Sequence, residues 1–166
     1  MFRTALLLFL LTASSACTST AVKPAAKPVY ETYVQAGQTL PLTGLTDFRG
    51  QPVRADEPGK RKLVLLFATW CHDSQRAVSQ IMASELAKDP QLRIIGIGRG
   101  ENAEALAQFE AQYRTNFPLV TDPDNVIYNR FANAGIPRII LVDGDNRIVK
   151  TIIGEMPRAI DEIVWP

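Results

Sequence analysis

The chain has 166 residues, of which 46% are hydrophobic, and this is enough for one compact domain with a substantial core. Its 18 Lys and Arg residues nearly balance its 17 Asp and Glu residues, and the basic residues are spread along the chain. The sequence therefore lacks the electrostatic signature of a protein that binds nucleic acid or an anionic membrane surface.

The N-terminus has the pattern of a secretory signal peptide over residues 1–16. Arg3 is followed by an apolar run from Ala5 to Leu11 and then by small residues. This run is too short to span a bilayer, so we expect an exported, periplasmic protein. Residues 13–17, ASSAC, resemble a bacterial lipobox in which Ser14 replaces the usual leucine. Two alternatives stay open: lipid attachment at Cys17, which would anchor the chain to a membrane, or ordinary cleavage beside an unmodified cysteine.

A flexible tether is predicted over residues 17–35, because the stretch CTSTAVKPAAKPV is small, polar and interrupted by proline. The folded domain is predicted over residues 36–166. Within it, Cys71 is the only cysteine, so we expect no disulfide framework. A lone cysteine is most often a small buried hydrophobe, and its place in the fold therefore decides its role.

The elements of the domain follow from its apolar patterning, taken in chain order. Short apolar pieces between residues 38 and 53 predict one or two short strands. Strand and helix pairs are predicted over 63–68 and 74–88, 92–97 and 102–113, and 117–120 and 124–131. A hairpin is predicted from strands 139–142 and 148–153, followed by a last helix over 157–163. This order predicts an α/β domain with a central mixed sheet and helices on both faces.

Three blocks of sequence carry a resemblance to a known family: KLVLLFATWCHDS at 62–74, FPLVTDP at 117–123 and GIPRIILVDGDNRIV at 135–149. With them, residues 36–164 resemble the thioredoxin fold, a three-layer sandwich, and within it the envelope thiol-disulfide oxidoreductases of the TlpA/ResA type. The resemblance implies that Cys71 is the attacking cysteine and that Trp70 is the aromatic residue before it. It also implies that Pro137 is the cis-proline that presents backbone to a substrate, beside Ile136.

The chain departs from the family pattern at two positions. Ser74 stands where the resolving cysteine of a C-x-x-C motif belongs, and Arg138 replaces the small residue that commonly follows the proline. His72 and Asp73 fill the variable pair. A serine hydroxyl can donate a hydrogen bond to a thiolate, but it cannot attack a mixed disulfide. The expected partners are therefore protein thiols or disulfides and a separate reductant thiol.

The position of Cys71, between a strand and a helix, favours a reactive thiol. Unpaired N–H groups and the positive end of the helix dipole both stabilise a thiolate at a helix N-terminus. A protonated His72, and Arg138 if it folds over the cysteine, would act in the same direction, whereas Asp73 would oppose them. The sequence thus predicts thiol-disulfide exchange through one nucleophilic cysteine.

Two other functions remain open at this point. The first is a non-catalytic thioredoxin-like module that binds an extended peptide with the surface around Trp70, Ile136 and Pro137. The second is a one-cysteine thiol peroxidase, for which Arg138 is the only supporting residue. We expect no cofactor and no metal site, because His72 is the only histidine and the DPD and DGD sequences are typical of turns.

Overall fold

The computed structural model describes residues 29–165. The predicted signal peptide, the first part of the predicted tether and Cys17 lie outside these residues. None of the helices within 29–165 combines the length and the apolar character that crossing a bilayer requires.

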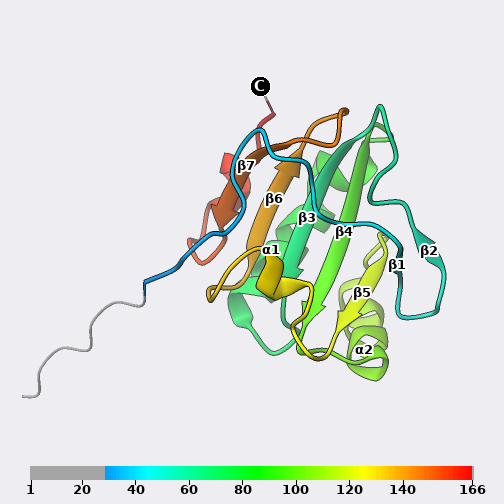
Figure 1. Cartoon of the computed structure of the whole chain (residues 1–166). Coiled ribbons are helices and arrows are strands. Elements are labelled where there is room, and N and C mark those ends of the chain that lie inside the picture. The colour runs from blue at the N-terminus through cyan, green and yellow to red at the C-terminus, as the bar shows by residue number, and fades with distance from the viewer. Residues whose placement is uncertain (1–28, 166) are drawn as a thin grey trace, which may run out of the picture.

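Five strands form a central mixed sheet in the order β5-β4-β3-β6-β7 (Figure 1). The central strand β3 (Arg61–Phe67) pairs in parallel with β4 (Leu92–Arg99) and antiparallel with β6 (Arg138–Val142). The outer strands are β5 (Leu119–Asp122), parallel to β4, and β7 (Ile148–Ile153), antiparallel to β6. The predicted α/β class, the mixed sheet and the hairpin are therefore confirmed.

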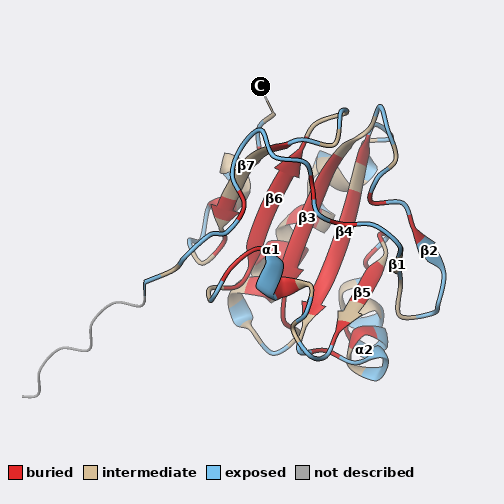
Figure 2. Cartoon of the chain, viewed as in Figure 1, coloured by how far each residue is buried: buried red, intermediate tan, exposed pale blue. Residues whose placement is uncertain are grey.

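The continuous apolar run of β3 is buried on both faces of the sheet, as Figure 2 shows for the central strands. Alternate residues of the strand enter two different hydrophobic clusters. Leu63, Leu65 and Phe67 point to one face, and Val64 and Leu66 point to the other. This double burial explains why the strand is apolar at almost every position instead of alternating.

Both α-helices lie on the same face of the sheet. The helices α1 (His72–Ala83) and α2 (Ala103–Tyr113) bury Val78 and Ile81, and Leu106 and Phe109, in one cluster. Two short 3-10 helices, η1 (Glu85–Lys88) and η3 (Ala159–Glu162), also contribute to this face.

Helices were predicted on both faces, and in the described residues the other face carries the 3-10 helix η2 but is covered mainly by extended chain. Figure 1 shows the N-terminal segment, in blue to cyan, crossing this face. Val34, Leu40 and Leu42 pack there against β3 and β6, beside the 3-10 helix η2 (Tyr128–Arg130). A small hairpin of β1 (Leu45–Thr46) and β2 (Pro52–Val53) follows the segment, as predicted.

Three predicted helices are shorter than expected. The helix predicted over 74–88 ends at Ala83, because the hydroxyl of Ser84 accepts from the N–H of Leu86 and starts a separate turn, η1. The helix predicted over 124–131 is reduced to η2, because the carboxylate of Asp122 accepts the N–H groups of Ile127 and Tyr128. The helix predicted over 157–163 is the single 3-10 turn η3.

The packed part of the chain begins before residue 36, where the domain was predicted to start. The N–H of Tyr33 donates to the carbonyl of Phe131 at 2.8 Å, and the N–H of Glu31 donates to the side chain of Asn133 at 2.9 Å. Val34 is buried. Residues 31–34 therefore belong structurally to the domain, although their composition is typical of a tether.

Candidate active site

Cys71 is the N-cap residue of α1, four residues after the end of β3. Its carbonyl accepts from the N–H of Gln75 at 3.0 Å, and its own N–H donates to the carbonyl of Ala68 at 3.2 Å. The side chain makes no capping hydrogen bond to the helix. The sulfur, half-buried, thus lies beside the unpaired N–H groups of the first turn, which is the placement that the sequence predicts.

The cysteine faces the peptide bond between Ile136 and Pro137, which is cis as the resemblance implied. The thiol of Cys71 donates a hydrogen bond to the carbonyl oxygen of Ile136 at a sulfur–oxygen distance of 3.7 Å. These two residues are far apart in the sequence and come together because β6 lies directly beside β3. The structure therefore joins the predicted attacking cysteine to the predicted cis-proline.

The loop after β7 packs against the other side of Pro137. The N–H of Gly154 donates to the carbonyl of Pro137 at 2.7 Å. A Cβ atom at position 154 would lie 2.7 Å from Cγ of Pro137, so only glycine allows this approach. Met156 follows in the same loop and is 56% exposed.

Ser74, in the place of a resolving cysteine, is completely buried. Its hydroxyl oxygen accepts from the N–H of Ala68 at 3.3 Å and so ties the first turn of α1 to the end of β3. The hydroxyl keeps one proton to donate, and its predicted donation to a Cys71 thiolate stays a prediction. Within residues 29–165, Cys71 is the only cysteine.

The variable pair of the motif points away from the interior. His72 is exposed at the first position of α1. Asp73 forms an ion pair with Arg76 at 2.6 Å, and Arg76 also donates to the carbonyl of Glu155 at 3.1 Å. The positive charge of Arg76 therefore offsets the negative charge of Asp73, which was expected to oppose a thiolate at Cys71.

Arg138 donates its hydrogen bonds away from Cys71, so the condition under which it would stabilise the thiolate is not met. Its side chain is 1% exposed and binds the N-terminal segment and the loop before the cis-proline. The guanidinium donates to the carbonyl of Ala134, to the hydroxyl of Thr32 at 2.7 Å and to the carbonyl of Glu31 at 3.2 Å. Arg138 is thus a structural tie between segments.

Trp70 is 70% exposed, directly before the cysteine. A shallow hollow lies beside it, between the β3–α1 loop and α2, lined by Thr69, Trp70, Ala105, Gln108, Phe109 and Gln112. An exposed indole on a loop next to the sulfur is a surface that an incoming polypeptide can contact.

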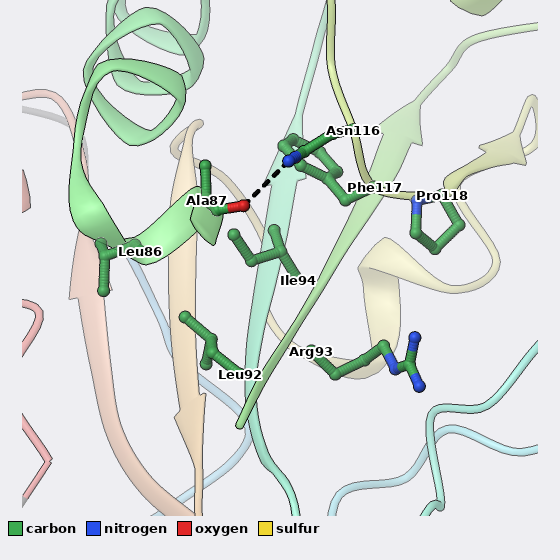
Figure 3. Close-up of a pocket in the computed structure, with 8 residues that line it drawn as sticks. All are labelled: Leu86, Ala87, Leu92, Arg93, Ile94, Asn116, Phe117 and Pro118. Atoms are coloured by element: carbon green, nitrogen blue, oxygen red, sulfur yellow. Dashed lines mark hydrogen bonds between the residues drawn. The ribbon is translucent and has the colours of Figure 1, made fainter. Parts of the chain in front are cut away.

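Another pocket lies at the opposite end of β4 (Figure 3). It is formed by η1, the first residues of β4 and the segment 116–118, where Asn116 donates to the carbonyl of Ala87 at 2.8 Å. Because β3 and β4 are parallel and Cys71 follows the C-terminal end of β3, this pocket is remote from the cysteine. Within the described residues, no three His, Cys, Asp or Glu side chains lie close enough together to hold a metal ion.

Two side chains to which the sequence analysis assigned no role, Glu101 and Gln75, bind Thr69 in the loop before Cys71. The carboxylate of Glu101 accepts two hydrogen bonds from Thr69, and the amide of Gln75 donates to the carbonyl of Thr69 at 2.8 Å. Glu101 lies in the β4–α2 loop, 32 positions from its partner. The only sequence signal was a carboxylate beside the glycines that end β4, which is also typical of an ordinary turn.

This sheet order, with a cysteine at the N-cap position of α1 opposite a cis-proline, defines a thioredoxin-like oxidoreductase. The redoxin family model matches residues 35–163, and the chain belongs to the redoxin family. The thiol-disulfide oxidoreductase ResA of Bacillus subtilis is 26% identical over 130 residues, which cover 76% of this chain and 72% of the relative. The predicted resemblance to the TlpA/ResA type is therefore confirmed.

Solved structures agree with this assignment. A proposed protein disulfide isomerase from Bacteroides thetaiotaomicron superposes with a TM-score of 0.71 at 27% identity, covering 80% of this chain and 87% of that one. A secreted disulfide oxidoreductase from Mycobacterium tuberculosis superposes with a TM-score of 0.55 at 21% identity, covering 72% and 94%. The thioredoxin-like fold that the sequence predicted is thus confirmed.

Proposed function

We propose that the protein performs thiol-disulfide exchange through one nucleophilic cysteine, Cys71, with an external thiol completing each cycle. The observation that carries the proposal is the placement of the Cys71 sulfur at the N-terminus of α1, 3.7 Å from the carbonyl of Ile136. A thiolate is the attacking species in this exchange, and the unpaired N–H groups of the first turn of α1 are hydrogen-bond donors beside the sulfur. The family to which the chain belongs supports the same chemistry.

The exchange has two steps. The Cys71 thiolate attacks one sulfur of a partner disulfide, a mixed disulfide forms, and the second partner sulfur leaves as a thiolate that takes up a proton. Ser74 cannot resolve the mixed disulfide, because an oxygen nucleophile does not replace a thiolate in this exchange. A second thiolate must attack the partner sulfur and release Cys71. If that thiolate belongs to the substrate, the net reaction is isomerisation. If that thiolate belongs to another molecule, the partner leaves joined to this molecule by a new disulfide.

The substrate side of the proposal is a polypeptide. Trp70 is an exposed apolar side chain on the loop that leads to Cys71. Met156 is an exposed apolar side chain on the loop after β7, in which Gly154 packs on Pro137. Exposed apolar side chains on these two loops suit an unfolded or extended chain better than a small hydrophilic thiol. A peroxidase function loses its only support, since Arg138 binds the N-terminal segment.

We also propose that the protein works outside the cytoplasm, in the periplasm, with or without a lipid at Cys17. The apolar run from Ala5 to Leu11 supports export. The Mycobacterium tuberculosis neighbour is described as secreted, which agrees with this location. The mass of the mature N-terminus, measured from a membrane fraction, distinguishes a lipid-modified Cys17 from plain cleavage.

The proposal is tested by trapping the mixed disulfide. The purified protein is incubated with oxidised insulin, quenched with acid and analysed by mass spectrometry without reductant. We expect a covalent adduct at Cys71 that persists and that added glutathione releases, and none with Cys71→Ser. The rate of alkylation of Cys71 by iodoacetamide at pH 7 should exceed that of glutathione. An unreactive sulfur and no adduct would remove the enzymatic proposal. Peptide binding that survives in Cys71→Ala without exchange would favour the binding module.

A further inference from the structure

The carboxylate of Glu101 binds the loop that leads into Cys71. We propose that Glu101 is a positioning residue for the reactive sulfur: its buried carboxylate fixes the backbone of Thr69 and thereby the geometry of the Thr69–Cys71 turn. The inference rests on the proposed function, because it assigns a role beside the same nucleophile. Glu101 acts on the sulfur through Thr69, to which its carboxylate is hydrogen-bonded.

The carboxylate reaches the loop because the end of β4 leaves room for it. Glu101 is 5% exposed and lies between β4 and α2. Its N–H donates to the carbonyl of Gly98 at 3.1 Å. A Cβ atom at Gly98 would lie 2.9 Å from Cβ of Glu101 and 2.7 Å from a methyl group of Leu106. Glycine at position 98 therefore lets the glutamate fold across the edge of the sheet toward the neighbouring β3–α1 loop.

Each polar group of Thr69 is held. The same carboxylate oxygen, Oε1 of Glu101, accepts from the backbone N–H of Thr69 at 2.7 Å and from its hydroxyl at 2.7 Å. The carbonyl of Thr69 accepts from the side-chain amide of Gln75 at 2.8 Å. Thr69 is therefore held by hydrogen bonds from two other side chains, one on the β4–α2 loop and one on α1.

The consequence for Cys71 follows from the shortness of the loop. Only residues 68–71 join the end of β3 to the start of α1. The sulfur has no cap bond of its own to the helix, so its direction toward Ile136 depends on the backbone before it. A displacement of about 1 Å at a reacting group can cost about 100-fold in rate, and Thr69 is two residues from that group.

Glu101 acts through the hydrogen bonds that its oxygen accepts from Thr69 and not through its negative charge. A carboxylate near the cysteine opposes the thiolate electrostatically, so its charge cannot be what favours the reaction. The two bonds to Thr69 need an oxygen acceptor, which a glutamine also provides. A positioning role therefore predicts that Glu101→Gln keeps the reactivity of Cys71 and that Glu101→Ala loses it.

The test compares four variants by the rate of Cys71 alkylation and by kcat and KM for insulin reduction with glutathione. We expect Glu101→Ala to slow alkylation and to lower kcat by about tenfold, with KM changed by less than about twofold. Glu101→Gln should stay within about threefold of the wild type. Thr69→Val, which loses the hydroxyl bond, should be intermediate, and adding it to Glu101→Ala should cause no further loss. If Glu101→Ala does not fold, Thr69→Val and Glu101→Gln carry the comparison.

The matched control is Asn102→Ala, which removes the N-cap of α2 next to Glu101, where the side chain of Asn102 accepts from the N–H of Ala105 at 2.9 Å. It should lower the unfolding temperature and leave the alkylation rate within about twofold of the wild type. Three results overturn the inference: unchanged alkylation in Glu101→Ala, equal loss in Glu101→Gln, or equal loss in Asn102→Ala. A wild-type Cys71 that reacts no faster than glutathione instead overturns the proposed function.

Discussion

The guanidinium of Arg138 donates a hydrogen bond to the hydroxyl of Thr32 at 2.7 Å, across 106 positions of the sequence. It also donates to the carbonyls of Glu31 and Ala134, so one buried side chain joins the start of β6, the loop before Pro137 and the N-terminal segment. The segment that leads to the N-terminus is thereby attached next to the residues that face Cys71.

Replacing Arg138 with leucine should release the N-terminal segment. The change leaves the oxygens of Glu31, Thr32 and Ala134 without their donor in a partly buried place, and we expect a loss of about 2 kcal/mol in the free energy of unfolding. Urea denaturation measures this loss, and limited proteolysis between residues 29 and 36 reports the release. Thr32→Val removes one bond only and should cost about 1 kcal/mol. A fully protected segment in Arg138→Leu would contradict the role of this side chain.

Gly154→Ala should disturb the site from the side of Pro137. The new methyl group would lie 2.7 Å from Cγ of Pro137 and 3.2 Å from its carbonyl oxygen, so the loop carrying Met156 must move. We expect a destabilisation of about 2 kcal/mol and a higher KM for a protein disulfide. Differential scanning calorimetry and insulin reduction measure the two effects.

The control for this prediction is Gly144→Ala, in the turn between β6 and β7. There the nearest atom to a new Cβ is a backbone carbon of Gly59 at 3.5 Å, an ordinary contact. This variant should retain the KM of the wild type. Equal behaviour of the two alanine variants would mean that the packing on Pro137 is not what shapes substrate binding.

The parts of the site that could be predicted depend on residues that lie close together in the sequence. Cys71 and Ser74 lie on one strand-to-helix turn, which apolar patterning locates, and the resemblance added Pro137 as the residue that faces them. The contacts of Arg138 and Glu101 could not be predicted in this way, because their partners are 106 and 32 positions away and depend on side-chain direction. The helix expected over 124–131 failed for a related reason, since Asp122 takes the N–H groups of Ile127 and Tyr128.

Ser74→Cys should restore a two-cysteine cycle. Position 74 is one helical turn from Cys71, a spacing that allows a disulfide. We expect an internal disulfide after treatment with oxidised glutathione and at least about tenfold faster insulin reduction with a dithiol reductant, because release of the substrate becomes intramolecular. Thiol titration and mass spectrometry under non-reducing conditions measure the disulfide.

The matched control is Ser79→Cys, which adds a thiol on the exposed side of α1 two turns from the site. It should leave both thiols within residues 29–165 free and keep the turnover of the wild type. If both thiols of Ser74→Cys within residues 29–165 also stay free under oxidising conditions, the local geometry does not allow the resolving step, and the serine is then not a simple replacement of a resolving cysteine.

Lys62 is a buried cation on β3, and removing its charge should stabilise the protein. The side chain is 0% exposed, and its ammonium group donates to the carbonyl of Lys60 at 3.1 Å. Burial lowers the pKa of Lys62 below its usual range, and the negative charges of Asp143, Glu57 and Asp56 oppose this shift only in part. The folded state therefore holds the proton of this lysine less tightly than the unfolded chain does.

The sign of the pH dependence follows from this difference. Between the lowered pKa of the folded state and the ordinary value of 10.5, the unfolded chain binds more protons, so the free energy of unfolding rises with pH in that window. At pH values below this window, which include neutral pH, the full free-energy cost of burying the charge destabilises the folded state. We expect Lys62→Met to raise the free energy of unfolding at pH 7 by about 1 kcal/mol, since methionine keeps most of the length of the lysine side chain without the charge. Urea denaturation from pH 7 to pH 10 should show the gap between wild type and variant narrowing as the pH rises.

Lys88→Met, at an exposed lysine paired with Glu85, should change stability by less than about 0.5 kcal/mol at every pH. A Lys62→Met protein that is less stable than the wild type, with a gap independent of pH, would mean that the ammonium group is held by stronger contacts than its bond to Lys60.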